Sequence, residues 1–124
     1  MTNRTGPVDL RTKDFERVLA ENDFLVLNFV ARWCGPCRAF LVAYADTAGE
    51  NDDIVFALVD VDREPDLAVA FDVTAIPKVA VVRGGAVVFS HEGALPEDAL
   101  RDVLRQVREL DVERLRRAVA EASG

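Results

Sequence analysis

The segment Phe24-Leu25-Val26-Leu27-Asn28-Phe29-Val30 is apolar at every position except Asn28. A strand with one solvent-facing side alternates apolar and polar residues, whereas a parallel strand buried on both sides is apolar almost throughout. The segment therefore predicts a strand in the interior of a sheet, and each face of that sheet needs a covering layer. An α/β architecture meets this requirement because helices can pack on both faces.

The rest of the chain provides the other strands and the covering helices. Three more apolar segments predict strands, the last two joined by the Gly84-Gly85 turn as an antiparallel hairpin: 54–61, 78–82 and 87–90. Four segments show helical patterns: 13–21, 34–48, 65–70 and 96–110. Asp62 is suited to cap the third of these helices. The order βαβα followed by ββα predicts an α/β fold, with a mixed central sheet and helices on both faces.

Length and charge limit the classes of function. The length of 124 residues is that of one domain, and a formal net charge of −7 argues against nucleic acid or an anionic membrane as the main partner. Residues 1–8 form an expected arm, residues 9–110 the domain, and residues 111–124 a helical extension. For this amphipathic extension, a solvated helix is favoured over packing on the domain or on a partner. The first residues lack a signal-peptide core and no segment suits a membrane span, so we expect a cytoplasmic location. A monomer is the default expectation for the oligomeric state.

Both cysteines of the chain, Cys34 and Cys37, stand three residues apart, directly after the apolar strand. Their spacing is compatible with a disulfide, which needs Cα atoms roughly 5.5 Å apart. A structural staple across so short a loop would add only roughly 2 kcal/mol, so that role is disfavoured. A metal site needs four ligands, and the single histidine, His91, is far downstream. A reversible dithiol that exchanges with other disulfides fits the pair best.

The neighbours of the pair favour ionisation of the first sulfur. Cys34 is expected just before the first turn of a helix, where unpaired N–H groups and the helix dipole stabilise a thiolate. Arg32 and Arg38 add positive charge on either side of the pair. Gly35 and Pro36 set the geometry of the small ring, and proline is tolerated in a first helical turn.

The residues around the dithiol resemble a known family. The sequence Trp33-Cys34-Gly35-Pro36-Cys37, placed after a buried strand, resembles the active site of the thioredoxins. The similarity covers about residues 8–110 and includes three further segments: Val73–Pro77, Gly84–Gly85 and Gly93–Leu95. The resemblance implies a thioredoxin-like fold and an oxidoreductase that reduces disulfides in other proteins.

The same resemblance implies a role for each residue of the site. Cys34 would be the nucleophile and Cys37 the buried resolving thiol. Ile76-Pro77 would be a cis peptide facing the dithiol, and the Ile76 backbone would pair with the substrate chain as an added strand. Trp33 would form one wall of that groove. A thioredoxin reductase would regenerate the dithiol, so the chain itself would hold no cofactor.

Some positions depart from the family pattern. Thioredoxins usually have a buried aspartate in place of Asn28 and a lysine in place of Leu58, and both charges are missing here. Their joint loss is physically consistent because an unpaired buried lysine is costly. We expect Asn28 to be a hydrogen-bonded core amide, and Cys37 to lack a built-in proton acceptor. Lys78 replaces the usual threonine, and we expect it to point outward from an edge strand rather than to add charge near the groove.

The predicted function is therefore thiol–disulfide exchange on proteins through a mixed disulfide. An oxidase or isomerase is a weaker alternative, because Gly35-Pro36 and the missing signal peptide point away from it. A thioredoxin-like binding module or co-chaperone with weak redox activity is the other alternative. The changes at Asn28 and Leu58 support this binding module, while the intact dithiol opposes it. Catalysis of insulin reduction by dithiothreitol would separate the two.

Overall fold

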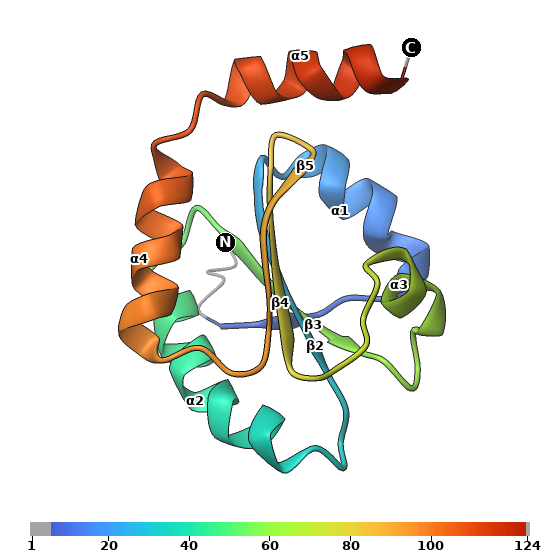
Figure 1. Ribbon diagram of the computed structural model, residues 1–124, viewed down its shortest axis with the longest axis vertical. Helices are drawn as coiled ribbons and strands as arrows, with labels where there is room; N and C mark the ends of the chain where they lie inside the picture. The colour runs from blue at the N-terminus through green and yellow to red at the C-terminus, as the bar shows by residue number, and fades with distance from the viewer. Residues whose placement is uncertain (1–5, 124) are drawn as a thin grey trace, which may run out of the picture.

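Five strands form one central sheet in the computed structural model, which describes residues 6–123 (Figure 1). The strands are β1 (Val8–Asp9), β2 (Phe24–Val30), β3 (Val55–Asp60), β4 (Lys78–Arg83) and β5 (Ala86–Glu92). The helices are the 3-10 helix η1 (Thr12–Asp14), α1 (Phe15–Glu21), α2 (Gly35–Gly49), α3 (Pro65–Ala70), α4 (Glu97–Arg108) and α5 (Val112–Ser123). The strand order is β1-β3-β2-β4-β5, which confirms the predicted mixed sheet.

Strand β2 occupies the middle of this sheet, as its apolar sequence predicts. It runs parallel to β3 and antiparallel to β4, so that Leu27 lies between Ala57 and Ala80. Residues 24–29 of the strand are all buried. Strand β5 lies at an edge and is largely exposed or half-buried, which explains its more polar sequence.

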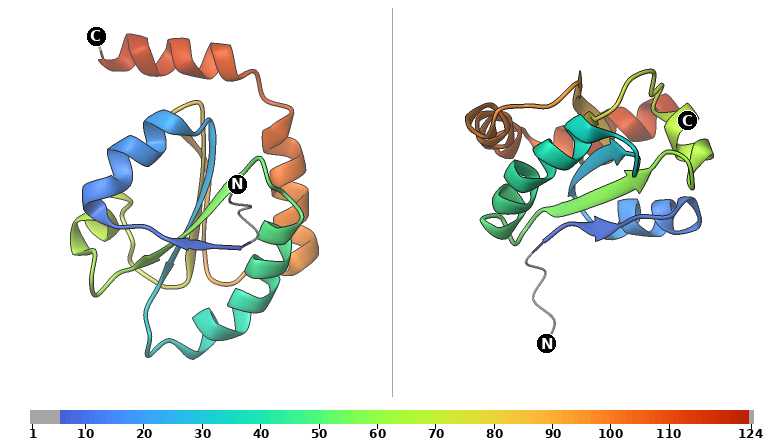
Figure 2. Two further views of the ribbon diagram at one scale, coloured as in Figure 1. Left: turned by 180° about the vertical axis from the view of Figure 1, so that it is seen from behind. Right: turned by 90° about the horizontal axis from the view of Figure 1, so that it is seen from below.

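Helices cover both faces of the sheet, and Figure 2 shows the same layers from behind and from below. Helices α2 and α4 pack on one face through side chains such as Tyr44 and Leu104. Helices α1 and α3 pack on the other face through Leu19 and Leu67. The two apolar clusters are separated by the sheet itself, so the expected covering of both faces is confirmed.

The N-terminal end differs from the predicted division of the chain. Val8, which that division assigns to the arm, pairs in β1 with β3, and the N–H of Leu10 donates to the carbonyl oxygen of Leu58 (2.9 Å). Strand β1 has only two residues and one of them is Asp9, so no apolar run marks it in the sequence. Residues 1–5 of the expected arm lie outside the described residues.

Helix α5 lies across the hairpin end of the sheet (Figure 1). Val112 and Leu115 contact the β4–β5 turn at Gly84, where a Cβ atom would stand 3.2 Å from Leu115 Cβ and from the Val112 carbonyl oxygen. Gly84 also has a φ of 60°, a conformation that favours glycine. Arg116 forms an ion pair with Asp23, which precedes β2. The solvated-helix interpretation is therefore wrong for this side of α5, although most of the helix is exposed.

Candidate active site

The dithiol lies in the connection between β2 and α2. Strand β2 ends at Val30, a short loop follows, and α2 begins at Gly35. Cys34 and Cys37 form a disulfide with their Cα atoms 5.3 Å apart, within the range that disulfides adopt. The structure therefore shows the pair in its oxidised form, and the sequence holds no third cysteine that could compete for either sulfur.

The two sulfurs differ in their relation to α2. Cys34 is the N-cap residue of the helix, and its Sγ accepts a hydrogen bond from the main-chain N–H of Cys37 (3.1 Å). Gly35 and Pro36 occupy the first two helical positions, where proline needs no hydrogen-bond donor. Exposure does not distinguish the cysteines, because Cys34 is 4% exposed and Cys37 is 3% exposed. Only Cys34 sits where N–H groups and the helix dipole stabilise a thiolate.

Trp33 borders the disulfide as an exposed aromatic ring. Trp33 is 69% exposed, and its indole Nε1–H donates to Asp62 Oδ2 (2.9 Å). Asp62 does not cap α3, as its place in the sequence suggests, because the N-cap position belongs to Glu64. The hydrogen bond instead fixes the orientation of the indole beside Cys34.

The Ile76-Pro77 segment reaches the disulfide from the second half of the chain. Its peptide bond is cis, as the family resemblance implies. Ile76 packs against the small buried cluster of Ala31, Cys34 and Cys37. Pro77 is buried, and its carbonyl oxygen accepts a hydrogen bond from the N–H of Gly93 (2.7 Å). The fold thus brings together Trp33, the two cysteines and the Ile76-Pro77 peptide, which the sequence places far apart.

Arg32 and Arg38 are both exposed at the edge of the site. The Nη1 of Arg38 donates to the carbonyl oxygen of Arg32 (2.5 Å), so this guanidinium is bound to the loop. Within residues 6–123, neither arginine forms a hydrogen bond with a cysteine sulfur. Because solvent screens exposed charges, their effect on Cys34 is weaker than that of the helix N-terminus.

Asn28 lies inside the sheet, two residues before β2 ends. It is fully buried, and its neighbours in register are Leu58 of β3 and Val79 of β4. Within residues 6–123, neither its Nδ2 nor its Oδ1 has a hydrogen-bond partner. The expectation of a hydrogen-bonded core amide is therefore wrong, because the apolar Leu58 and Val79 offer its side chain no partner. An unsatisfied buried amide of this kind costs about 1–3 kcal/mol.

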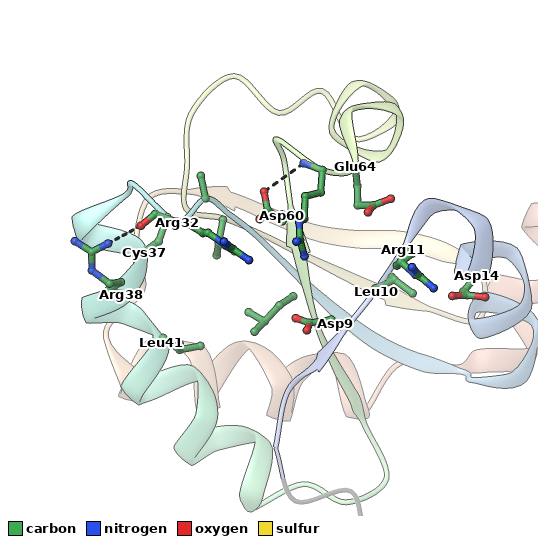
Figure 3. A pocket seen from close by; sticks show the side chains of 14 residues that line it. Asp9, Leu10, Arg11, Asp14, Arg32, Cys37, Arg38, Leu41, Asp60 and Glu64 are labelled. Atoms are coloured by element: carbon green, nitrogen blue, oxygen red, sulfur yellow. Dashed lines mark hydrogen bonds between the residues drawn. The ribbon is translucent and has the colours of Figure 1, made fainter.

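A pocket of about 520 Å³ opens beside Cys37 (Figure 3). Leu41 of α2 and Leu58 of β3 contribute apolar surface to it. Its charged lining residues are acidic and basic in equal number: Asp9, Asp14, Asp60, Glu64, Arg11, Arg32, Arg38 and Arg63. Trp33 and Ile76 are not among the lining residues, so the pocket is separate from the surface that they form. Sequence reasoning missed it because the lining residues come from segments with no common local pattern.

Glu64 connects this pocket to the first helix. Its Oε1 accepts a hydrogen bond from the main-chain N–H of Thr12 (2.9 Å), which joins η1 to the start of α3. This hydrogen bond holds the pKa of Glu64 below its usual value. The carboxylate form is therefore the one that the folded chain favours.

Lys78 does not point outward from an edge strand, and that expectation is wrong. Strand β4 is internal because β5 lies outside it, and Lys78 is only 8% exposed. Its Nζ donates to the carbonyl oxygens of Phe71 (2.8 Å) and Asp72 (3.3 Å). The sequence carries no signal for this contact because it depends on how α3 ends.

Outside the disulfide, the described residues offer few reactive groups. Residues 6–123 hold no group of three or more His, Cys, Asp and Glu side chains placed to bind one metal ion. In the same residues, no helix has the length and apolar character that a membrane crossing requires. His91 stacks on Phe89 within β5, with ring centroids 6.5 Å apart.

Comparison with known proteins agrees with this site. The thioredoxin family model matches residues 6–106. The "Putative thioredoxin 2" of Streptomyces coelicolor is 44% identical over 117 residues, which cover 94% of this chain and 87% of the relative. Thioredoxin-1 of Caenorhabditis elegans is 32% identical over 96 residues, which cover 76% of this chain and 84% of the relative.

Solved structures support the same assignment. Oxidised mitochondrial thioredoxin 3 of Saccharomyces cerevisiae aligns with a TM-score of 0.74 at 30% identity, covering 81% of this chain and 94% of that protein. The predicted fold and the predicted thiol–disulfide exchange by the Cys34–Cys37 pair are confirmed by these similarities. Thioredoxins as a family act on disulfides in other proteins and are served by thioredoxin reductases. The chain belongs to the thioredoxin family of thiol–disulfide oxidoreductases.

Proposed function

We propose that Cys34 attacks the disulfides of protein substrates and that Cys37 resolves the resulting mixed disulfide. The observation that carries this proposal is the N-cap position of Cys34, where its sulfur accepts the Cys37 N–H. The Cys34 thiolate would bond to one substrate sulfur, and the other would leave as a thiolate and take up a proton. The Cys37 thiolate would then attack the Cys34 sulfur and release the second substrate thiol. The substrate gains two electrons and the chain ends as the Cys34–Cys37 disulfide.

The substrate chain would lie against Trp33 and the Ile76-Pro77 peptide. Within residues 6–123, the main chain of Ile76 forms no backbone hydrogen bond, so its N–H and carbonyl are available to an extended substrate segment. Pairing of this kind adds a strand to the binding protein and depends little on the substrate sequence. The indole of Trp33, fixed by Asp62, supports an apolar wall beside that strand.

The proton of Cys37 would leave without the help of a buried carboxylate. Asn28 and Leu58 cannot accept it, whereas the pocket beside Cys37 gives solvent a route to this side of the dithiol. Water or the departing substrate thiolate would therefore accept the proton. Asn28→Asp should speed turnover near neutral pH, measured as the pH profile of insulin reduction. Asn28→Leu is the control, because it adds no acceptor. Identical profiles for Asn28→Asp and the wild type would contradict this part of the proposal.

The central test is catalysis of insulin reduction by dithiothreitol. The wild-type chain should accelerate the reaction, and Cys34→Ser should abolish the acceleration. Because Trp33 is the only tryptophan and adjoins Cys34, its fluorescence should change when the disulfide is reduced. A wild-type chain without catalysis would favour the binding module instead.

The partners of this particular chain are part of the same proposal. We expect a flavin- and NADPH-dependent thioredoxin reductase to reduce the Cys34–Cys37 disulfide, which a coupled NADPH-oxidation assay would measure. We also expect a cytoplasmic location, since both cysteines of the sequence are in the redox pair and neither is left for a structural staple. The default expectation for the oligomeric state is a monomer. Sedimentation velocity would check the monomer, and fractionation of cells that produce the protein would check the compartment.

The redox function would reside in residues 9–110, with residues 111–124 as a stabilising extension. The family match to residues 6–106 supports this division, as does the packing of α5 on the β4–β5 turn. A chain that ends at Leu110 should keep insulin-reduction activity and unfold at a lower temperature. Loss of activity in a truncated chain that is still folded would contradict the division.

A further inference from the structure

Lys78 is a buried lysine that directly follows the Ile76-Pro77 peptide in the sequence. It is the first residue of β4 and follows the cis Pro77. A lysine that is only 8% exposed loses most of the hydration of its ammonium group, and such a loss is tolerated only where hydrogen bonds replace the water. The carbonyl oxygens of Phe71 (2.8 Å) and Asp72 (3.3 Å) provide those hydrogen bonds.

The way in which α3 ends explains why these two carbonyls need a donor. The N–H groups of Asp72 and Val73 turn back to carbonyls of the last helical turn (3.0 and 2.9 Å), with Asp72 at a φ of 57°. This Schellman-type closure satisfies carbonyls inside the helix but not the two that follow it. Within residues 6–123, no backbone N–H donates to the Phe71 or Asp72 carbonyl. Lys78 binds both, and so attaches the end of α3 to β4.

A second contact holds the middle of the same segment. The hydroxyl of Thr74 donates to Glu92 Oε2 (2.5 Å), and Glu92 lies opposite Lys78 in the β4–β5 register. The hydrogen bond from Thr74, and after it the charge of Lys78, lower the pKa of Glu92. Glu92 is thus a carboxylate at neutral pH. Segment 71–76 is therefore attached at its start to Lys78 and at its middle to Glu92.

The far end of segment 71–76 is Ile76, which packs against the cluster formed by Ala31, Cys34 and Cys37. We propose that Lys78 is a positioning residue that fixes segment 71–76 so that the Ile76 main chain meets an extended protein substrate beside Cys34. This inference rests on the proposed function, in which the Ile76 backbone pairs with the substrate. A small disulfide has no chain to pair with Ile76, so Lys78 favours protein disulfides over small ones.

The test compares one protein disulfide, insulin, with one small disulfide, hydroxyethyl disulfide, in the wild type and in Lys78→Met. Methionine keeps the length of the side chain and removes the donor. Lys78→Met should raise KM for insulin about fivefold or more and leave kcat within about twofold, because the lost interaction aids binding in both ground and transition states. The rate of hydroxyethyl disulfide reduction should stay within about twofold of the wild type. The rate of Cys34 alkylation should also stay within about twofold of the wild type at each pH.

Two more variants make the result specific. Lys78→Arg retains donors for the carbonyls. Its KM for insulin should therefore rise by no more than half as much as the KM of Lys78→Met. Thr74→Val removes the second contact and should raise KM for insulin about twofold, without touching Lys78. If Lys78→Met does not fold, Lys78→Gln decides, because glutamine is polar but too short to bind both carbonyls, and an unchanged KM for insulin in that variant overturns the proposal.

The outcomes also separate this inference from the proposed function. A folded Lys78→Met with an unchanged KM for insulin, or with equal losses on insulin and hydroxyethyl disulfide, overturns the positioning role while exchange by Cys34 stands. A wild-type chain that reduces neither disulfide overturns the proposed function itself.

Discussion

The two ends of the central sheet differ in how completely other elements cover them. At the dithiol end, Trp33 is 69% exposed, a pocket of about 520 Å³ opens beside Cys37, and Asn28 has no hydrogen-bond partner within residues 6–123. At the hairpin end, α5 lies so close to Gly84 that a Cβ atom there would meet it at 3.2 Å. The comparison shows that the exposed indole and the open pocket lie where the chemistry is, whereas a helix covers the turn at the opposite end. A buried polar atom without a hydrogen-bond partner in residues 6–123 is found at both ends, since Arg83 Nε of β4 is another.

The largest expected effect concerns the dithiol end alone. Cys37→Ser leaves Cys34 able to attack but removes the thiol that resolves the mixed disulfide, so turnover should fall below detection. Covalent adducts between the variant and insulin chains should accumulate, which intact-protein mass spectrometry would measure. Reduced Cys37→Ser should lose about 1–2 kcal/mol of unfolding free energy relative to the reduced wild type, because a hydroxyl replaces a buried thiol among apolar neighbours, but it should still fold. Sustained turnover without adducts would contradict the assigned roles of the two sulfurs.

The next effect concerns the hairpin end. Gly84→Ala adds a methyl group where Leu115 is too close, and at a φ of 60°. The free energy of unfolding should fall by about 1–2 kcal/mol, measured by urea denaturation. Gly85→Ala is the matched control: its φ of 84° is also unfavourable, but its nearest contact is 3.9 Å away, so it should lose less. Insulin reduction should be unchanged in both variants. Equal losses would show that α5 does not press on this turn.

A smaller effect would test whether the buried Asn28 amide at the dithiol end lowers the free energy of unfolding. Asn28→Leu replaces a buried amide that has no partner in residues 6–123 with an apolar side chain of similar size. The free energy of unfolding should rise by about 1 kcal/mol, since the desolvated polar group is removed. Urea denaturation of the oxidised chains would measure the change. A loss of stability would mean that the Asn28 amide is satisfied in solution, and the contrast between the two ends would weaken.

The smallest effect follows from the lowered pKa of Glu64, which the Thr12 N–H stabilises as a carboxylate. A carboxyl group with a lowered pKa in the folded state contributes stability that is present above the usual value of 4.5 and is lost as pH falls through the folded value. The wild type should therefore be more stable than Glu64→Gln at neutral pH. That difference should shrink at about pH 3, measured as urea midpoints across the range. A difference independent of pH would contradict the assignment.

The central strands could be predicted from the sequence because burial on both faces leaves a continuous apolar run. Residues 24–30 show such a run, and the strand that they form is β2 in the structure. The two-residue strand β1 could not be predicted in this way, because it forms only through pairing with β3. The dithiol could also be predicted from the sequence, since its chemistry depends on residues that adjoin one another.

The surroundings of the dithiol depend instead on contacts between distant segments. The outward position expected for Lys78 is wrong because its partners are main-chain carbonyls that follow α3. The sequence of side chains does not indicate such main-chain partners. Asn28 was expected to find a partner because buried amides usually do, and only the observed neighbours Leu58 and Val79 show that it does not. The pocket beside Cys37 requires that β1, α2 and the β3–α3 connection meet, which no local pattern encodes.

The contact between α5 and Gly84 has a consequence for anyone who recombines members of this family. The C-terminal helix and the β4–β5 turn behave as a matched pair, because a side chain at the turn would occupy the space that Val112 and Leu115 fill. Consider a chimera that receives residues 111–123 but carries alanine or a larger residue at the position of Gly84. The side chain at the turn would prevent the transplanted helix from packing there. The glycine would have to be transferred together with the helix.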